Sequence, residues 1–134
     1  MWSTQHYRQL VRASAWYDLI VTAAFATPWT FVLLHGALAG IAVRFGIPGE
    51  LGEFGPLPML MANLMGSIVC VWALLRIRDP QPRFGRYDAA GRALFALWQA
   101  YALSQGASLI LLPFLFAEIA WGVAQALPLR TPKP

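Results

Sequence analysis

Glu118 is the residue whose type and position most strongly suggest chemistry. It lies near the middle of an apolar run, residues 109–127, that is long enough to cross a bilayer. An acidic side chain inside the hydrocarbon core costs roughly 2.5–3.5 kcal/mol on insertion scales, so it normally has a partner or a function. Because an apolar setting favours the neutral acid, we expect Glu118 to hold or exchange a proton, or to take part in binding a ligand.

Other polar residues are expected to share a pocket with Glu118 in the outer half of the membrane. Asn63 and Gln99 should lie at a similar depth on other helices, within hydrogen-bonding reach of the carboxyl group. Gln125 lies two turns after Glu118 on the same helix face. His35 could reach this cavity and serve as a proton partner. The alternative is structural: a protonated Glu118 held by Asn63 or Gln99 would only determine how the helices pack.

Tryptophan occurs once in each predicted span, away from the outermost turns. A ring of indoles could line a pocket for a flat hydrophobic ligand such as a quinone, a sterol or a pigment. Aromatic residues at helical spacing more often serve packing, so both interpretations stay open. The four residues are Trp29, Trp72, Trp98 and Trp121, and Trp121 belongs to the predicted ligand site.

A second group of charged residues is expected at the cytoplasmic boundary of the spans. Asp18, Asp88, Arg76 and Arg92 all lie near the ends of apolar runs. Asp88 and Arg92 are four residues apart and would face each other on one helix. We predict ion pairs that close the inner end of the helices. Binding of anionic lipid headgroups by the arginines is the functional alternative.

The composition places these residues in a membrane protein. Of 134 residues, 58% are hydrophobic and 12% are charged, and the charged share is about half that of a soluble domain. A span needs about 20 apolar residues, so the chain has room for four spans and for no separate soluble domain. The net charge of +4 does not indicate nucleic-acid binding, because the arginines flank apolar runs and form no basic stripe with exposed aromatic residues.

The predicted fold is an all-α integral membrane protein, a four-helix transmembrane bundle that forms a single domain over residues 1–134. Residues 44–57 are rich in glycine and proline and should form a cap over the outer half. Pro28 lies within the long first span and should kink it. The spans are expected at about residues 16–42, 58–75, 89–105 and 109–127.

Basic residues predict the orientation and the location. Five arginines lie in residues 76–92, which should therefore be cytoplasmic. Both termini would fall on the same side, and Arg130 and Lys133 support this at the C-terminal end. The preference for arginine over lysine, with much alanine, leucine and glycine, suggests a bacterial source. We therefore predict a multi-pass protein of the cell membrane, the inner membrane of a bacterium.

A weak internal repeat relates the two halves of the chain. A real repeat would make the fold a tandem pair of helical hairpins, related by a pseudo-twofold axis along the membrane normal. Chance similarity between segments built from alanine, leucine and aromatic residues is the alternative. The matching positions, at equal offsets, are Asp18 and Phe25 with Asp88 and Phe95, and Pro58 and Asn63 with Pro113 and Glu118.

Several kinds of site are not supported. Cys70 is the single cysteine, so an internal disulfide and a cysteine-based metal site are excluded. His35 and Glu118 are too few ligands for a metal, and His6, at the opposite end, could not join His35 as a second haem ligand. The sequence has no Ser/His/Asp set at one depth and no phosphate-binding glycine motif. It assigns no cofactor and no catalytic residue.

These observations leave three hypotheses for the function. In the first, the protein binds or transports a small or lipophilic ligand in a polar pocket around Glu118, with or without a coupled proton. It would work in the bilayer as a homodimer or with a partner. In the second, it is a non-catalytic accessory subunit of a larger membrane complex, and Glu118 serves packing. A membrane enzyme that uses Glu118 as acid or base is the least supported, because no catalytic constellation accompanies it.

Overall fold

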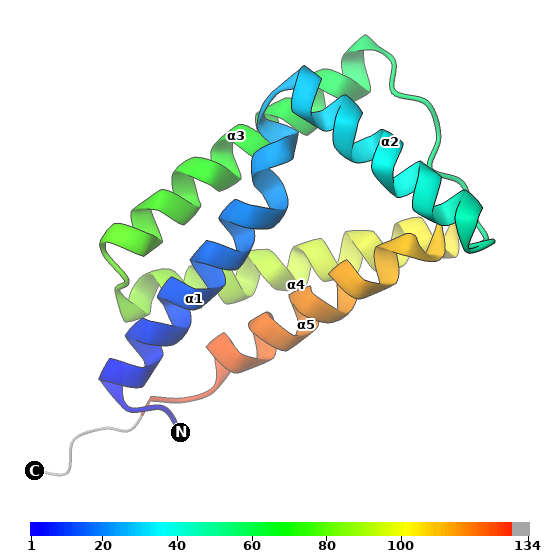
Figure 1. The fold of residues 1–134 in the computed structure, drawn as a ribbon. Coiled ribbons are helices and arrows are strands. Elements are labelled where there is room, and N and C mark those ends of the chain that lie inside the picture. Colours follow the sequence, from blue (N-terminus) through cyan, green and yellow to red (C-terminus); the bar gives the residue numbers. More distant parts are fainter. Residues whose placement is uncertain (130–134) are drawn as a thin grey trace, which may run out of the picture.

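The computed structural model describes residues 1–129, and the regular secondary structure of this part of the chain is helical, with no β-strand (Figure 1). Two short 3-10 helices, η1 and η2, join the longer helices. Arg130 and Lys133, which entered the prediction of orientation, lie outside the described residues. The elements are α1 (Thr4–Thr22), η1 (Ala23–Ala26), α2 (Pro28–Arg44), α3 (Pro56–Arg78), α4 (Pro82–Ser104), η2 (Leu109–Leu111) and α5 (Leu112–Ala126).

The helix starts follow from local sequence chemistry. The side chain of Ser3 caps α1 by accepting a hydrogen bond from the backbone N–H of His6 at 3.2 Å. Thr27 caps α2 in the same way, accepting from the N–H of Thr30 at 3.2 Å. The helices α2, α3, α4 and α5 each begin with proline in the first two positions, where the missing N–H costs no hydrogen bond.

The first predicted span is two helices rather than one kinked helix. The run from Thr4 to Ala26 and the helix α2 meet at an angle of 106°. Thr27 is extended, with φ −133° and ψ 150°, because a residue before proline is disfavoured in the helical region. Pro28 also provides no N–H to continue the earlier helix. The break therefore turns the chain by more than a right angle, which a kink within one continuous helix would not do.

The helices form two pairs that cross. Helix α1 and η1 pack along α3, and α4 packs along α5 (Figure 1). These are the segments that the internal repeat relates, although the repeat itself stays a prediction. Close approach needs glycine: a Cβ on Gly66 would lie 2.6 Å from the backbone nitrogen of Ala26, and one on Gly85 would lie 2.7 Å from the hydroxyl of Tyr7.

Helix α2 and the loop after it close the far side of the molecule. The loop between α2 and α3 is attached to the turn after α4 by three backbone hydrogen bonds. Glu50 donates to Gly106 at 3.0 Å, Ser108 donates to Glu50 at 3.0 Å, and Leu109 donates to Pro48 at 3.0 Å. The loop is therefore held at its middle against the other hairpin.

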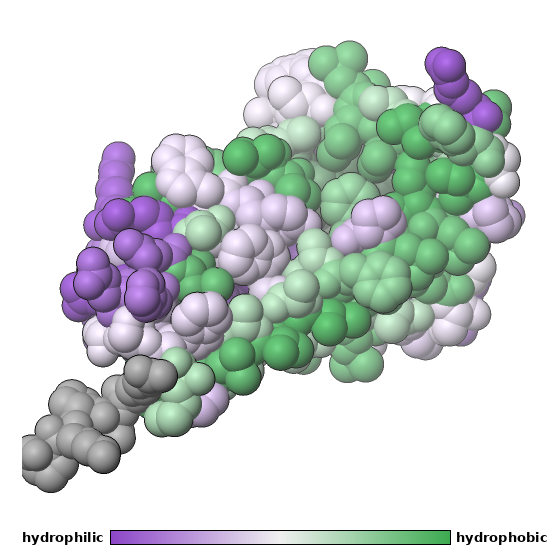
Figure 2. All heavy atoms as spheres, turned by 60° about the horizontal axis from the view of Figure 1, so that its bottom comes forward, coloured by the Kyte–Doolittle hydropathy of each residue, from purple (hydrophilic) through white to green (hydrophobic). Residues whose placement is uncertain are grey.

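The distribution of burial is inverted relative to a water-soluble protein. Among the described residues, six hydrophobic residues are buried, against seven polar or charged ones. Large apolar side chains are exposed along the helices, such as Trp29 at 77% and Val43 at 83%. Figure 2 shows hydrophilic residues gathered at one end and hydrophobic residues over most of the rest of the face in view. An apolar surface of this extent needs a non-aqueous partner.

Two described helical segments, Pro56–Arg78 and Leu109–Ala126, are long and apolar enough to cross a membrane. They become three if α1, η1 and α2 are counted together as one bent span. The sequence predicted four. Helix α4 is outside this set, and its first half carries the charged residues Arg83, Arg86, Asp88 and Arg92.

Candidate functional site

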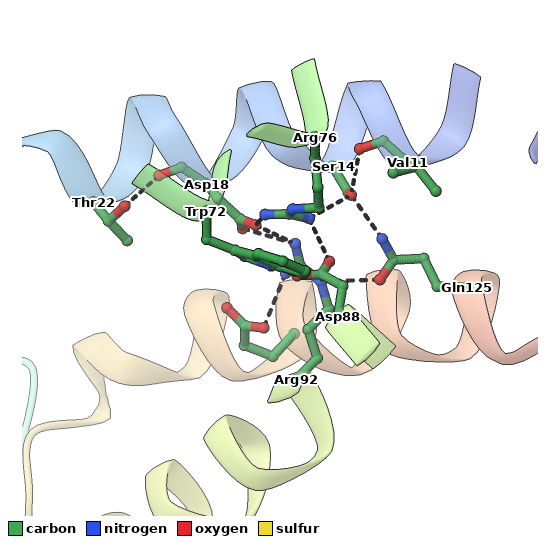
Figure 3. A network of polar contacts seen from close by, with 10 residues as sticks. Val11, Ser14, Asp18, Thr22, Trp72, Arg76, Asp88, Arg92 and Gln125 are labelled. Atoms are coloured by element: carbon green, nitrogen blue, oxygen red, sulfur yellow. Dashed lines mark hydrogen bonds and ion pairs between the residues drawn. The ribbon is translucent and has the colours of Figure 1, made fainter. Parts of the chain in front are cut away.

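Five charged side chains from α1, α3, α4 and α5 meet through ion pairs, within the network of polar contacts that Figure 3 shows. Both arginines are buried, with the side chain of Arg76 at 0% exposure and that of Arg92 at 3%. The three carboxylates are 7–12% exposed. We call this set the charged cluster; it consists of Asp18 from α1, Arg76 from α3, Asp88 and Arg92 from α4, and Glu118 from α5.

Arg76 joins α3 to the two helices that carry the aspartates. Its guanidinium forms ion pairs with Asp18 and, at 2.6 Å, with Asp88. It also donates to the hydroxyl of Ser14 at 3.2 Å. The centroid of the Trp72 ring lies 5.4 Å from the guanidinium carbon of Arg76, a distance suited to a cation–π contact.

Arg92 contacts all three carboxylates of the charged cluster. Its Nη2 lies 2.7 Å from Asp18, its Nε 3.0 Å from Asp88, and its Nη1 3.0 Å from Glu118. The Nε also lies 3.3 Å from the side-chain oxygen of Gln125. Arg92 therefore connects α1, α4 and α5 through a single side chain.

Neutral groups surround the cluster and orient its members. Trp72 donates its indole N–H to Asp88 at 3.0 Å. Gln125 donates to Ser14 at 2.7 Å, and Tyr7 donates its hydroxyl to the backbone carbonyl of Gln125 at 2.7 Å. Such bonds offset the cost of burying charge, although the Nε of Arg76 is buried and no partner for it is found among the described residues.

The charged cluster has one carboxylate more than it has guanidinium groups, so it carries a charge of −1 when all five groups are ionised. Asp18 and Asp88 each contact both arginines, whereas Glu118 contacts only Arg92. Glu118 is thus the member with the weakest compensation. A proton or a cation at Glu118 would balance the charge of the cluster.

Glu118 lies beside two hollows. A cavity of about 110 Å³ is bordered by all three carboxylates and by the side chains of Trp72 and Tyr87. On the other side of Glu118, a groove of about 300 Å³ runs between α4 and α5. The small residues of this groove are Ala89, Ala93, Ala96, Gly122 and Ala126. Glu118 therefore faces space on two sides, which a carboxylate used only for packing does not need.

The structure divides the predicted ligand set. Glu118 and Gln125 come together at Arg92. Asn63 does not reach them, because its amide donates to the carbonyl of Phe25 in η1 at 2.8 Å. The side-chain oxygen of Gln99 is buried, and no partner for it is found among the described residues. The expectation that Asn63 and Gln99 hydrogen-bond Glu118 is therefore wrong.

His35 and Trp121, two further residues of the predicted ligand site, pack against other aromatic side chains. His35 packs against the rings of Phe31 and Phe54, which also contact each other, on the α2 side of the molecule. Trp121 packs against Tyr17, with ring centroids 6.0 Å apart. Neither contact contains Glu118, so the single pocket expected from the sequence is not formed.

The tryptophans do not form a ring around a pocket. Trp29 and Trp98 are exposed at 77% and 61%. Trp72 donates a hydrogen bond to Asp88 of the charged cluster, and Trp121 packs against Tyr17. Each predicted span contains one tryptophan at a similar depth. This does not bring the four indoles together, because the helices that carry them belong to two pairs that cross at an angle.

The four residues expected to form ion pairs at the boundary do pair with one another: Asp18 with Arg76 and Arg92, and Asp88 with the same two arginines. The correction concerns Glu118, which was placed at a different depth and instead joins them through Arg92. Their location at the cytoplasmic boundary stays a prediction.

Ser14 and Tyr7 belong to the hydrogen-bonded surroundings of the charged cluster, which was not predicted from the sequence. The signal was present in the sequence, because Tyr7, Val11, Ser14 and Asp18 are spaced by four, three and four residues and share one helix face. All four are buried in the structure. Tyr7 and Ser14 lie before the first predicted span, which begins at about residue 16, so the hydropathy pattern does not indicate that this face is buried.

Within the described residues, no group of three or more His, Cys, Asp or Glu side chains is arranged to hold a metal ion. Comparison with protein-family models, with curated proteins and with solved structures gives no match to this chain, so the function must be argued from its own geometry.

Proposed function

We propose that this chain is a four-span membrane protein that binds a small ligand at the charged cluster, with Glu118 exchanging a proton as the ligand enters or leaves. The observation that carries the proposal is the position of Glu118. It is the surplus carboxylate, it has one ion-pair partner, and it borders the cavity of about 110 Å³.

The inverted burial supports insertion in a membrane. In a bilayer the exposed apolar side chains contact lipid, and the buried charges contact one another rather than water. Helix α4 is the proposed fourth span, because Asp88 and Arg92 neutralise each other within the cluster. The remaining part of α4, from Ala93 to Ser104, contains no charged residue.

The arrangement of the helix ends supports a topology with both described ends on one side. The backbone N–H of Trp2 donates to the carbonyl of Pro128 at 3.0 Å. Arg12 donates to the carbonyl of Ile77, near the end of α3, at 3.2 Å. Basic residues gather around this end, and the positive-inside rule makes it cytoplasmic. We propose the inner membrane of a bacterium as the location.

Charge balance supports the coupling to a proton. When Glu118 is ionised, the cluster has a charge of −1 and can accept a cation in the cavity. When Glu118 is protonated, the remaining two carboxylates and two guanidinium groups balance each other. Binding of a positively charged ligand and binding of a proton at this site would therefore compete.

Infrared difference spectroscopy of the carboxyl groups tests this proposal. The full-length protein in lipid vesicles should show a carboxyl band that appears as the pH falls and is absent in Glu118→Gln. Glu50→Gln is the matched control, because Glu50 is exposed in the loop between α2 and α3. A band that titrates unchanged in Glu118→Gln would contradict the proposal.

A second candidate function is that of an accessory subunit in a larger complex. The groove between α4 and α5 favours it, because small residues let another transmembrane helix approach closely. This function predicts that Ala93→Leu, which narrows the groove, releases a stoichiometric partner while the Glu118 titration is kept. Loss of the titration with retention of the partner would favour the binding function instead.

A further inference from the structure

The cavity beside the charged cluster has properties that restrict the class of ligand it can hold. All three carboxylates of the cluster border it, and the five groups together carry a charge of −1 when ionised. An unbalanced negative charge that is largely removed from water attracts cations and repels anions. The class of ligand inferred here rests on the proposed function, since both concern the same site.

Glu118 supplies the negative charge that the protein leaves without compensation. Its Oε2 accepts a hydrogen bond from Arg92 at 3.0 Å, and no hydrogen bond to its Oε1 is found among the described residues. Oε1 is not one of the buried side-chain atoms that lack a partner, so it keeps contact with the space around it. Both oxygens of Asp18 and of Asp88, in contrast, accept hydrogen bonds from arginine or tryptophan.

The wall of the cavity is largely apolar in spite of the carboxylates. Most of its exposed surface is apolar, and three aromatic residues border it, namely Trp72, Tyr87 and Phe95. Tyr87 and Phe95 are 72% and 41% exposed, so the cavity lies next to the molecular surface on this side of α4. Aromatic side chains attract cations, above all cations that carry apolar substituents. A strongly hydrated inorganic ion would lose its water here without replacement.

The size of the cavity and the arrangement of its oxygens narrow the class further. A volume of about 110 Å³ is below the range of about 300–1,000 Å³ for drug-sized sites, so the cation should have few heavy atoms. Among the described residues, no three His, Cys, Asp or Glu side chains are arranged to hold a metal ion. The oxygens of both aspartates are directed at donors of the protein instead.

We propose that this cavity binds a small methylated ammonium ion, whose charge Glu118 balances. The positive charge of such an ion is spread over its methyl groups, so it needs a negative and apolar environment rather than directed hydrogen bonds. The methyl groups would contact Trp72, Tyr87 and Phe95, as in aromatic sites for quaternary ammonium ligands. The remaining four charged groups of the cluster would stay paired with one another.

Calorimetric titration of the full-length protein in maltoside micelles provides the test, with tetramethylammonium chloride as the probe. Saturable binding is expected. Tert-butyl alcohol, an uncharged molecule of similar shape, and potassium chloride should each bind at least about tenfold more weakly. Glu118→Gln should weaken binding of tetramethylammonium by a similar factor, and Glu50→Gln, in the exposed loop between α2 and α3, is the control.

Three further variants locate the ion and keep the proposal testable if Glu118→Gln misfolds. Gly91 borders the cavity, and a Cβ there would meet nothing within 4 Å, so Gly91→Leu should fill the cavity and abolish binding. Gly40→Leu is the matched control on α2, where a Cβ also meets open space. Ala93→Leu narrows the groove between α4 and α5 instead and should leave binding unchanged.

Three results would overturn the proposal: no saturable binding of tetramethylammonium, equal binding of tert-butyl alcohol or potassium, or loss of binding in Ala93→Leu but not in Gly91→Leu. A titrating carboxyl band of Glu118 without binding of tetramethylammonium would refute this ligand class and leave the proposed proton exchange in place. Binding that is lost in Gly91→Leu, in a protein without the titrating band, would support the ligand class and refute the proton exchange.

Discussion

The charged cluster and the aromatic pocket, the hollow lined by Phe31, His35 and Phe54 between α2 and the loop after it, are built in opposite ways. In the cluster, four helices are joined by ion pairs between side chains, and neutral donors orient several of its members. At the pocket, the contacts are between aromatic rings, and the loop is held by its backbone rather than by side chains. The first region depends on a few directional bonds between side chains, and the second on the contact area of aromatic rings and on backbone hydrogen bonds of the loop.

The comparison shows how a mostly apolar chain can specify its tertiary structure. In the proposed membrane setting, lipid is as apolar as leucine, so apolar contacts between helices give little preference for one arrangement. Ion pairs buried between the helices do give such a preference, because an unpaired buried charge is very unfavourable. The helix crossing should therefore be determined by the charged cluster, and the aromatic side should tolerate change.

Removal of Arg76 should produce the largest effect. Arg76→Met leaves Asp18 and Asp88 with one guanidinium between them, and loss of one partner from a buried ion pair costs about 3–5 kcal/mol. The free energy of unfolding in mixed micelles should fall by that amount. Arg78→Met is the control, since Arg78 is exposed at the end of the same helix. Equal stability of the two variants would refute the dominance of the cluster.

A substitution in the loop turn should have an intermediate effect. Gly49 has φ +100°, and a Cβ there would lie 2.5 Å from the Cα of Ser108. Gly49→Ala should therefore detach the loop from the turn after α4, at a cost of about 1–3 kcal/mol. Gly52→Ala is the matched control, because Gly52 also has positive φ but open space around it. Amide hydrogen exchange at Glu50 and Ser108 should increase much more in the first variant.

Loss of one ring from the aromatic pocket should have the smallest effect. Phe54 is 40% exposed, so Phe54→Leu should lose about 0.5–1.5 kcal/mol of ring contact with Phe31 and His35. The charged cluster should be undisturbed, and the carboxyl band of Glu118 should titrate as in the wild type. If Phe54→Leu destabilised the protein as much as Arg76→Met, the division into a specifying and a tolerant region would be incorrect.

Much of the local structure was predictable from the sequence. The prolines at 28, 56, 82 and 113 each stand in the first two positions of a helix, as expected of a residue that lacks an N–H. The pairing of Asp88 with Arg92 followed from their spacing of four residues. The cap-like loop between α2 and α3 followed from its glycine and proline content.

The grouping of the polar residues was not predictable, and Glu118 shows why. The hydropathy pattern predicts how deep a residue lies within a span. It does not predict how the helix is tilted or where it crosses another helix. Depth along the spans grouped Glu118 with Asn63, Gln99 and His35. The crossing of the two helix pairs instead brings it to Arg92, 26 residues earlier in the chain.

The sequence by itself determined the helical class and the apolar surface, because both depend on composition and on residues within a few positions of one another. Only the tertiary structure decided that the chain turns by 106° at Pro28 and that His35 is separated from Glu118. It also decided that the charges of four helices form one cluster. The physical reason is that an unpaired buried charge is very unfavourable, so the stable fold is one in which charged residues distant in sequence form ion pairs.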